Sequence, residues 1–247
     1  MAMATHDSGA RWKTFLSEAK EQEITLLLSG QTASPVIDVS FHELTGFDPE
    51  FAEDILISPR LIISSGHKTL SEICRDRGVD LDAMIRLSDL PKDTMRPLRE
   101  IGSRDIDKLR SLDVIVTKMS QLKPRIHLAV FQCETCGETQ QIDQTNESEL
   151  VEPIRCPPDT GCGASIRGTD STRFNLVMNI SRMINNQWLE IQELPENVPS
   201  GAQPSRAQVL LEGDLVNKHL PGQRITANVI PVVRSEIKKN KKTPMFD

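Results

Sequence analysis

Four of the five cysteines in this 247-residue chain lie within thirty residues of one another, as two pairs. Cys133 and Cys136 enclose two residues, Cys156 and Cys162 enclose five, and a glycine follows the second cysteine of each pair. A Cys-x2-Cys turn directs two thiolates at one ion, and the glycine lets the backbone fold beneath the sulfurs. Together the two pairs supply the four soft ligands of a closed, tetrahedral Zn²⁺ site.

Two other uses of these cysteines compete with zinc: a pair of disulfides, or a redox-active Cys-x2-Cys. The N-terminus has no apolar signal core, which argues against the secretory route that favours disulfides. Redox pairs do not come with a matching second pair. One structural zinc ion per chain is therefore the favoured interpretation, and we expect a cytoplasmic protein.

The composition and motifs exclude several classes of protein. No run of eighteen apolar residues is present, so no membrane span is expected. The sequence contains neither a Gly-x4-Gly-Lys-Ser/Thr phosphate loop nor a His-Glu-x2-His motif, and its five histidines are scattered. We therefore expect no enzymatic activity, ATP hydrolysis included, from this chain by itself.

Charge is distributed unevenly along the chain. The net charge of −6 argues against a generic nucleic-acid binder, but residues 1–100 carry eleven Lys and Arg against seventeen Asp and Glu, and the remainder carries eighteen of each. The basic residues of the second part gather at Arg234, Lys238, Lys239, Lys241 and Lys242. This basic tip favours a local, oriented contact with a polyanion, and the alternative is a solvated, frayed terminus.

The first 95 or so residues have the spacing of helices. Apolar positions predict an amphipathic helix over 11–28 and a further helix over 69–77. Between them, Asp48 followed by Pro49 predicts a helix start, with Pro59 as the end of that helix.

Short strands dominate from residue 103 onward, after a short helix predicted over 103–110. The predicted strands cover 113–119, 125–131, 173–177, 187–192, 207–211 and 224–230. Proline and glycine occupy the segments between them. This pattern predicts a small β-barrel, with a zinc-bound hairpin over about 131–170 projecting from its edge.

Several segments in a fixed order carry a family resemblance. They are 47–56, 96–109, 123–131, the cysteine pairs, 191–196, 213–216, 220–224 and 242–246. In this order they resemble the N-terminal half of the archaeal type of MCM (minichromosome maintenance) replicative helicase. The resemblance implies an α+β fold: a helical subdomain over 1–95, a five-stranded OB-fold β-barrel over 96–130 and 171–247, and a zinc-binding insert over 131–170.

The resemblance also implies partners. Such domains form a homo-hexamer around single- or double-stranded DNA, often stacked as a double hexamer through the zinc inserts. A C-terminal ATPase domain would follow residue 247 in the full-length protein, of which this chain would be a fragment. The loop over 193–205 would touch the neighbouring motor and couple the state of the DNA to ATP hydrolysis.

The implied DNA contacts fall on a β-hairpin and on the barrel. The hairpin, over 233–246, contains the five basic residues of the tip, and the barrel contributes Lys123, Arg125 and Arg206. The sequence departs from the family pattern at Glu190, where many relatives carry a basic residue. It departs again at Ser205, which separates Arg206 from the proline that the family's arginine follows.

Two other functions remain open beside that of a platform, meaning a ring of six such domains around DNA. A free-standing single-strand-binding protein would stack bases on exposed aromatics, and this chain has two Trp, seven Phe and no Tyr. A zinc-stabilised protein–protein assembly module is the other. DNA binding in multiples of six chains would favour the platform over both.

Overall fold

The computed structural model describes residues 2–32, 34–144, 149–167 and 171–233, with the backbone alone for residues 2–7. Within these ranges the chain forms two compact units. The first unit combines the chain up to residue 118 with 190–209 and 220–233, and the second combines 119–189 with 210–219. The chain therefore passes from one unit to the other repeatedly.

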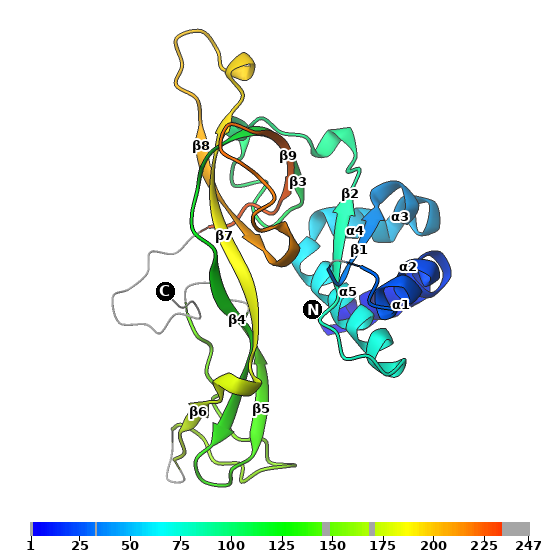
Figure 1. The fold of residues 1–247 in the computed structure, drawn as a ribbon, viewed down its shortest axis with the longest axis vertical. Helices are drawn as coiled ribbons and strands as arrows, with labels where there is room; N and C mark the ends of the chain where they lie inside the picture. Colours follow the sequence, from blue (N-terminus) through cyan, green and yellow to red (C-terminus); the bar gives the residue numbers. More distant parts are fainter. Residues whose placement is uncertain (1, 33, 145–148, 168–170, 234–247) are drawn as a thin grey trace. The chain divides into compact units, whose positions relative to one another are not determined.

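The helices of the first unit gather beside a short two-stranded sheet (Figure 1). They are α1 (Ala2–Ala19), α2 (Glu21–Leu28), α3 (Phe41–Phe47), α4 (Pro49–Ile57) and α5 (Pro59–Asp76). Their core holds Trp12, Phe15 and Phe51, with ring centroids 5.9 Å apart for Trp12–Phe15 and 5.2 Å apart for Trp12–Phe51. Both ring pairs meet edge to face, the arrangement that aromatic quadrupoles favour. None of the helices in the described ranges has the length and apolar character needed to cross a membrane.

The helix predicted over 11–28 is in fact two helices, which meet at Lys20. Lys20 is 5% exposed, and its Nζ lies 3.2 Å from a carboxylate oxygen of Glu23 and 3.0 Å from one of Glu43. A buried ammonium is tolerated only when it is paired. The chain turns at Lys20 and places this charge against α3.

The helix start at Asp48 is confirmed, because Phe51 N donates to Asp48 Oδ1 at 3.0 Å and Pro49 is the first helical residue. The predicted end of that helix at Pro59 is confirmed to within two residues, but Pro59 has a second role that was not predicted. α4 ends at Ile57, and Pro59 begins α5, ten residues before the start predicted for that helix. Proline is well suited to a first helical position because the missing N–H has no helical partner there.

A parallel pair of strands, β1 (Val36–Ser40) and β2 (Met84–Ser88), was not predicted. It pairs Val36 with Met84 and continues in register to Ser40 with Ser88. The paired residues lie 48 positions apart in the sequence. Each strand alone is too short to give a clear alternating pattern, so the sequence suggested only helices here.

The helix predicted over 103–110 is wrong, because this segment forms turns that lead directly into a strand. The carboxylate of Asp105 accepts a hydrogen bond from Gly102 N at 3.1 Å and one from Arg110 Nε at 2.7 Å. Asp107 has a φ of 59°. A side chain that bonds the neighbouring backbone competes with helix formation.

The remaining elements are mainly strands: β3 (Arg110–Met119), β4 (Lys123–Cys133), β5 (Thr139–Asp143), β6 (Phe174–Leu176), β7 (Arg182–Glu193), β8 (Arg206–Glu212) and β9 (Arg224–Val229). Their hydrogen-bonded order is β5-β4-β7-β3-β9, with β6 also paired to β4 and β8 to β7. β4 pairs antiparallel with β5, β6 and β7, and β3 does so with β9. All six predicted strands are confirmed, β5 is an addition, and the α+β class is confirmed.

In the second unit, β4 is the common partner of β5, β6 and the first part of β7 (Figure 1). Ile126, Ala129 and Phe131 of β4 form a small buried cluster. Four partly buried side chains pack against it, namely Ile142, Leu150, Phe174 and Leu176. A segment with so small a core needs a further source of stability.

Candidate metal centre and nucleic-acid interface

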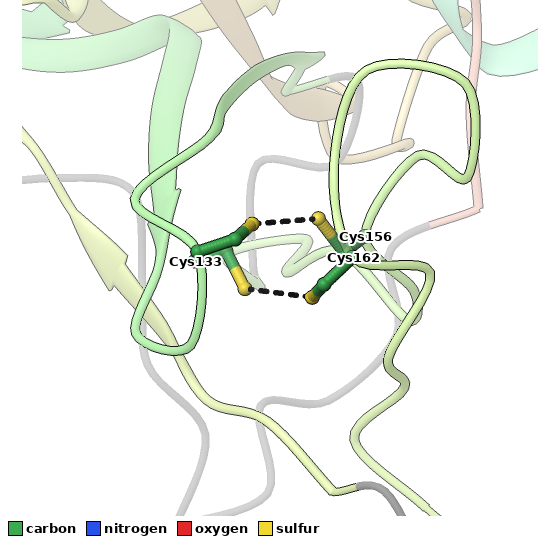
Figure 2. A group of neighbouring side chains, drawn as sticks. Cys133, Cys156 and Cys162 are labelled. Atoms are coloured by element: carbon green, nitrogen blue, oxygen red, sulfur yellow. Dashed lines mark hydrogen bonds between the residues drawn. The ribbon is translucent and has the colours of Figure 1, made fainter.

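The four cysteines of the two pairs come together in the second unit. Their sulfur atoms all lie within 4.8 Å of one another. The closest separations join one pair to the other: 3.7 Å between the sulfurs of Cys133 and Cys162, and 3.6 Å between those of Cys136 and Cys156. Figure 2 shows the sulfur of Cys133 facing those of Cys156 and Cys162, with dashed lines for the two shortest contacts between the pairs.

This geometry fits a tetrahedral thiolate site. Four sulfurs at the Zn–S bond length of about 2.3 Å stand about 3.8 Å apart along the edges of the tetrahedron. The observed separations of 3.6 and 3.7 Å are close to that value, and far from the 2.05 Å or so of a disulfide. All four cysteines are free.

The first pair lies on the turn between β4 and β5. Cys133 ends β4, Cys133 N donates to Glu138 O at 2.9 Å, and Gly137 N donates to Cys133 O at 2.9 Å. Gly137 has a φ of 77°, a conformation that side chains other than glycine disfavour. The glycine predicted to close this turn is therefore required there by its backbone conformation.

The second pair has an unusually long spacer, which Gly161 makes possible. A Cβ at Gly161 would lie 2.4 Å from Cys156 Sγ, closer than real Cβ atoms come, and 3.0 Å from Pro157 O, which is a tight contact. Gly161 N also donates to Pro157 O at 2.9 Å. The spacer thus folds back under the sulfur of Cys156. The sequence points to Gly163 as the glycine of this turn, and the turn residues before Gly161 are the signal for the second one.

The electrostatics of the cluster show why it suits a cation. A hydrogen bond from the Thr172 hydroxyl, helped by backbone N–H groups of the first turn, lowers the pKa of Cys133 to about 6. Burial, with the neighbouring sulfurs, raises the pKa of Cys156 to about 12. Without a positive charge the four sulfurs cannot all be ionised, whereas a divalent ion makes every one of them a thiolate.

Arg125, predicted to contact DNA, is buried in the second unit, with 5% of its side chain exposed. Its guanidinium forms an ion pair with Glu212 and donates to Gln144 O at 3.1 Å. A buried guanidinium depends on such partners. The placement of Arg125 therefore indicates a structural role, linking β4 to β8 and to the segment after β5. Lys123, at the start of β4, is only half-buried.

Arg206, at the start of β8, is exposed and lies in a group of charged side chains. Its Nη1 is 3.6 Å from Glu190 Oε1, and its Nε donates to Gln192 Oε1 at 3.0 Å. Glu190 Oε2 is also 3.3 Å from Lys118 Nζ. Hydrogen bonds from Lys118 first, and then from Thr117, lower the pKa of Glu190. Glu190 is therefore a carboxylate that neutralises basic charge on this surface.

The loop predicted to signal to a motor begins and ends in a fixed structure. Arg99 donates to both carboxylate oxygens of Glu193, Nε to Oε1 at 2.7 Å and Nη2 to Oε2 at 2.6 Å. Glu193 is 1% exposed, and its backbone N donates to Ser205 O at 3.0 Å. A bidentate pair of this kind fixes geometry as well as adding energy. The two ends of the segment 194–204 are held together at its base.

The basic tip falls outside the described residues. Its members are Arg234, Lys238, Lys239, Lys241 and Lys242. Their role in DNA binding stays a prediction from charge and from the family resemblance.

Known proteins resemble this chain in sequence and in fold. The sequence profile of the MCM OB domain matches residues 97–234, more than half of the chain. The fold matches the crystal structure of the N-terminal domain of an archaeal MCM, with a TM-score of 0.81 and 28% identity over 98% of this chain and 95% of that one.

Curated relatives include an archaeal and an animal protein. The minichromosome maintenance protein MCM of Saccharolobus solfataricus is 27% identical over 211 residues, which is 80% of this chain and 29% of the relative. The DNA replication licensing factor mcm4-A of Xenopus laevis is 25% identical over 204 residues, 81% of this chain and 22% of the relative. The chain thus spans less than a third of the length of these relatives. The predicted OB fold is confirmed, and the chain belongs to the MCM family of DNA replication proteins.

Proposed function

We propose that this chain is the DNA-binding platform of an MCM replicative helicase, which assembles as a ring of six around single- or double-stranded DNA. The observation that carries the proposal is the likeness to an archaeal MCM N-terminal domain over 98% of the chain. In this role the platform guides DNA during replication, and ATP hydrolysis belongs to a motor domain of the same protein. The proposed division is a helical part over 1–95, an OB-fold over 96–130 and 171–247, and an insert over 131–170.

DNA is proposed to contact the basic tip first and the OB-fold surface second. The tip concentrates five positive charges within nine residues. On the OB-fold, Lys123 and Arg206 are the candidates because they are half-buried and exposed, respectively, whereas Arg125 is buried against Glu212. Each phosphate contact adds affinity that is independent of sequence and sensitive to salt.

The test replaces Lys238, Lys239, Lys241 and Lys242 together by alanine and measures DNA affinity as a function of salt concentration. We expect most of the affinity to be lost, and the slope of log K against log salt to fall by about 0.7–0.9 per lost contact. An equal loss of charge at four other exposed lysines, Lys13, Lys68, Lys92 and Lys218, provides the control. An unaltered slope in the tip variant would contradict the proposal and transfer binding to the surface around Lys123 and Arg206.

The metal is proposed to be one structural Zn²⁺ per chain, held by Cys133, Cys136, Cys156 and Cys162. Four protein ligands leave no position open for a substrate water, so the ion stabilises the fold and takes no part in a reaction. Replacing Cys133 or Cys162 by alanine should remove the metal and unfold the insert, while the helices of the first unit keep their far-UV circular dichroism. Unchanged metal content in both variants would contradict this assignment.

Assembly through the insert is favoured by its exposed apolar side chains. Ile154 is 71% exposed and Ile166 is 43% exposed. The backbone N–H of Ile166 donates to Ile154 O at 3.0 Å, so these two residues lie side by side in neighbouring loop segments. Apolar side chains that are exposed side by side can form part of a larger contact with another protein surface. We propose that two rings stack through these inserts, and that the loop with its base at Glu193 couples DNA state to the motor.

A further inference from the structure

Thr172 lies against the sulfur cluster without belonging to either cysteine pair. Its Oγ1 is 3.2 Å from Cys133 Sγ, and the residue is 6% exposed. A second hydroxyl stands behind it, because Thr135 Oγ1 lies 2.9 Å from Thr172 Oγ1. The two hydroxyls and the sulfur therefore form a short row.

The direction of these hydrogen bonds follows from the state of the sulfur. A cysteine that binds a metal is a thiolate, which has no hydrogen and can only accept. The Thr172 hydroxyl must then donate to Cys133 Sγ, and the Thr135 hydroxyl donates to Thr172. The alternative acceptor for Thr172, the carbonyl of Arg173, is 3.4 Å away. Hydrogen bonds in such a chain polarise and strengthen one another.

The backbone on both sides of the Thr172 side chain is fixed. Thr172 N donates to Ser165 O at 2.9 Å, and Glu134 N donates to Arg173 O at 3.0 Å. The second of these bonds ties the chain entering β6 to the first cysteine turn. Thr172 thus comes from the chain that leads into β6, 39 residues from the cysteine that it contacts.

We propose that Thr172 is a positioning residue of the metal centre, whose hydroxyl holds the Cys133 thiolate in its ligand orientation, with Thr135 as the supporting donor. This inference rests on the proposed zinc site. Residues that hydrogen-bond a metal ligand fix its orientation and tune its basicity, and their loss typically weakens metal affinity about 10- to 100-fold.

The test compares Thr172→Val, which keeps the shape but removes the hydroxyl, with Thr172→Ser, which keeps the hydroxyl. Zinc affinity is measured by competition with a chromophoric chelator, and Co²⁺ substitution reports the thiolate-to-metal charge-transfer band. We expect Thr172→Val to bind zinc about 10- to 100-fold more weakly with a shifted cobalt band, and Thr172→Ser to stay within about threefold of wild type. Thr135→Val, which removes only the supporting donor, should weaken binding by a few-fold and covers the case in which Thr172→Val does not fold.

Three results would overturn the inference. Wild-type affinity in Thr172→Val and Thr135→Val would show that the hydroxyls do not act on the metal centre. An equal loss in Thr172→Val and Thr172→Ser would show that the hydroxyl by itself does not sustain metal binding, and would assign the effect to the packing of the whole side chain. If the wild-type protein takes up no metal, the zinc site and this inference are both overturned. If the wild-type protein takes up zinc normally, a negative result with the threonine variants overturns this inference alone and leaves the zinc site in place.

Discussion

At the scale of single residues, Gly161 decides how closely the chain can pass beneath Cys156. A Cβ at this position would lie 2.4 Å from the sulfur, so the loop has to move if any side chain is added. We expect Gly161→Ala to displace Cys156 and to weaken zinc binding by at least tenfold. Chelator competition measures the loss.

Gly46→Ala is the matched control for Gly161→Ala. Gly46 lies in α3 with nothing within 4 Å of the position of a Cβ, and helical alanine is more stable than glycine by about 0.5–1 kcal/mol. This variant should bind zinc as the wild type does. Normal zinc binding by Gly161→Ala would mean that the second loop does not hold Cys156 as described.

Glu190 makes a separate prediction on the surface that includes Arg206. Its carboxylate neutralises the charges of Lys118 and Arg206, so Glu190→Gln should leave both positive side chains available to contact DNA phosphates. We expect DNA affinity to rise several-fold, with a salt slope steeper by up to about 0.9. Glu53→Gln, the same charge change at an exposed position of α4, controls for net charge. Equal affinities for the two variants would remove this surface from the DNA path.

The residues of the metal centre differ in how far the sequence reveals them. The four cysteines could be predicted because ligand type and spacing are local properties. Thr172 could not, since its contact with Cys133 arises only when the insert closes on itself. Arg125 has a related explanation: basic character is visible in a sequence, but the partly exposed carboxylate of Glu212 that pairs with its guanidinium is 87 residues away.

At the scale of elements, the packing of α5 on α1 depends on Gly66. A Cβ there would lie 2.8 Å from the Trp12 ring and 2.9 Å from Ile85 Cδ1. Trp12 cannot easily retreat, because its Nε1 donates to Ile62 O at 2.8 Å. We expect Gly66→Ala to lower the free energy of unfolding by about 1–3 kcal/mol, measured by urea denaturation.

Gly9→Ala offers a control in the same pair of helices. The nearest atom to its Cβ position is Ser65 Oγ at 3.5 Å, an ordinary contact. Alanine should leave the free energy of unfolding unchanged or raise it by up to about 1 kcal/mol. Equal effects of the two substitutions would show that helix propensity, and not the space beside Trp12, governs both positions.

The elements predicted correctly are those whose signals are local. The cap at Asp48 and the alternation in β3, β4 and β9 can be read from a few neighbouring residues. β1 and β2 are stabilised by each other across 48 residues, and β5 contains a single strongly apolar residue, Ile142. Such strands are stabilised mainly by pairing with a distant strand, so the residues around them contain little local signal for β-structure.

At the scale of the whole molecule, assembly and metal content should change together. We expect light scattering to give a mass near six or twelve chains of 27.6 kDa at low salt, falling when a chelator removes the zinc. The physical reason is that the proposed contact between rings lies on the insert, which has too little core to stay folded without its ion. A mass that is unchanged after complete metal loss would contradict assembly through the insert.

The repeated passage of the chain between the two units has a consequence for inheritance. The first unit is encoded by three separate stretches, because β3 and β9 come from opposite ends of the strand region and the second half of β7 joins them. A recombination event cannot transfer that unit as one uninterrupted piece of gene. The cysteine segment, in contrast, is a continuous stretch between β4 and β6, so its length and surface can diverge between lineages while the strands around it keep their register.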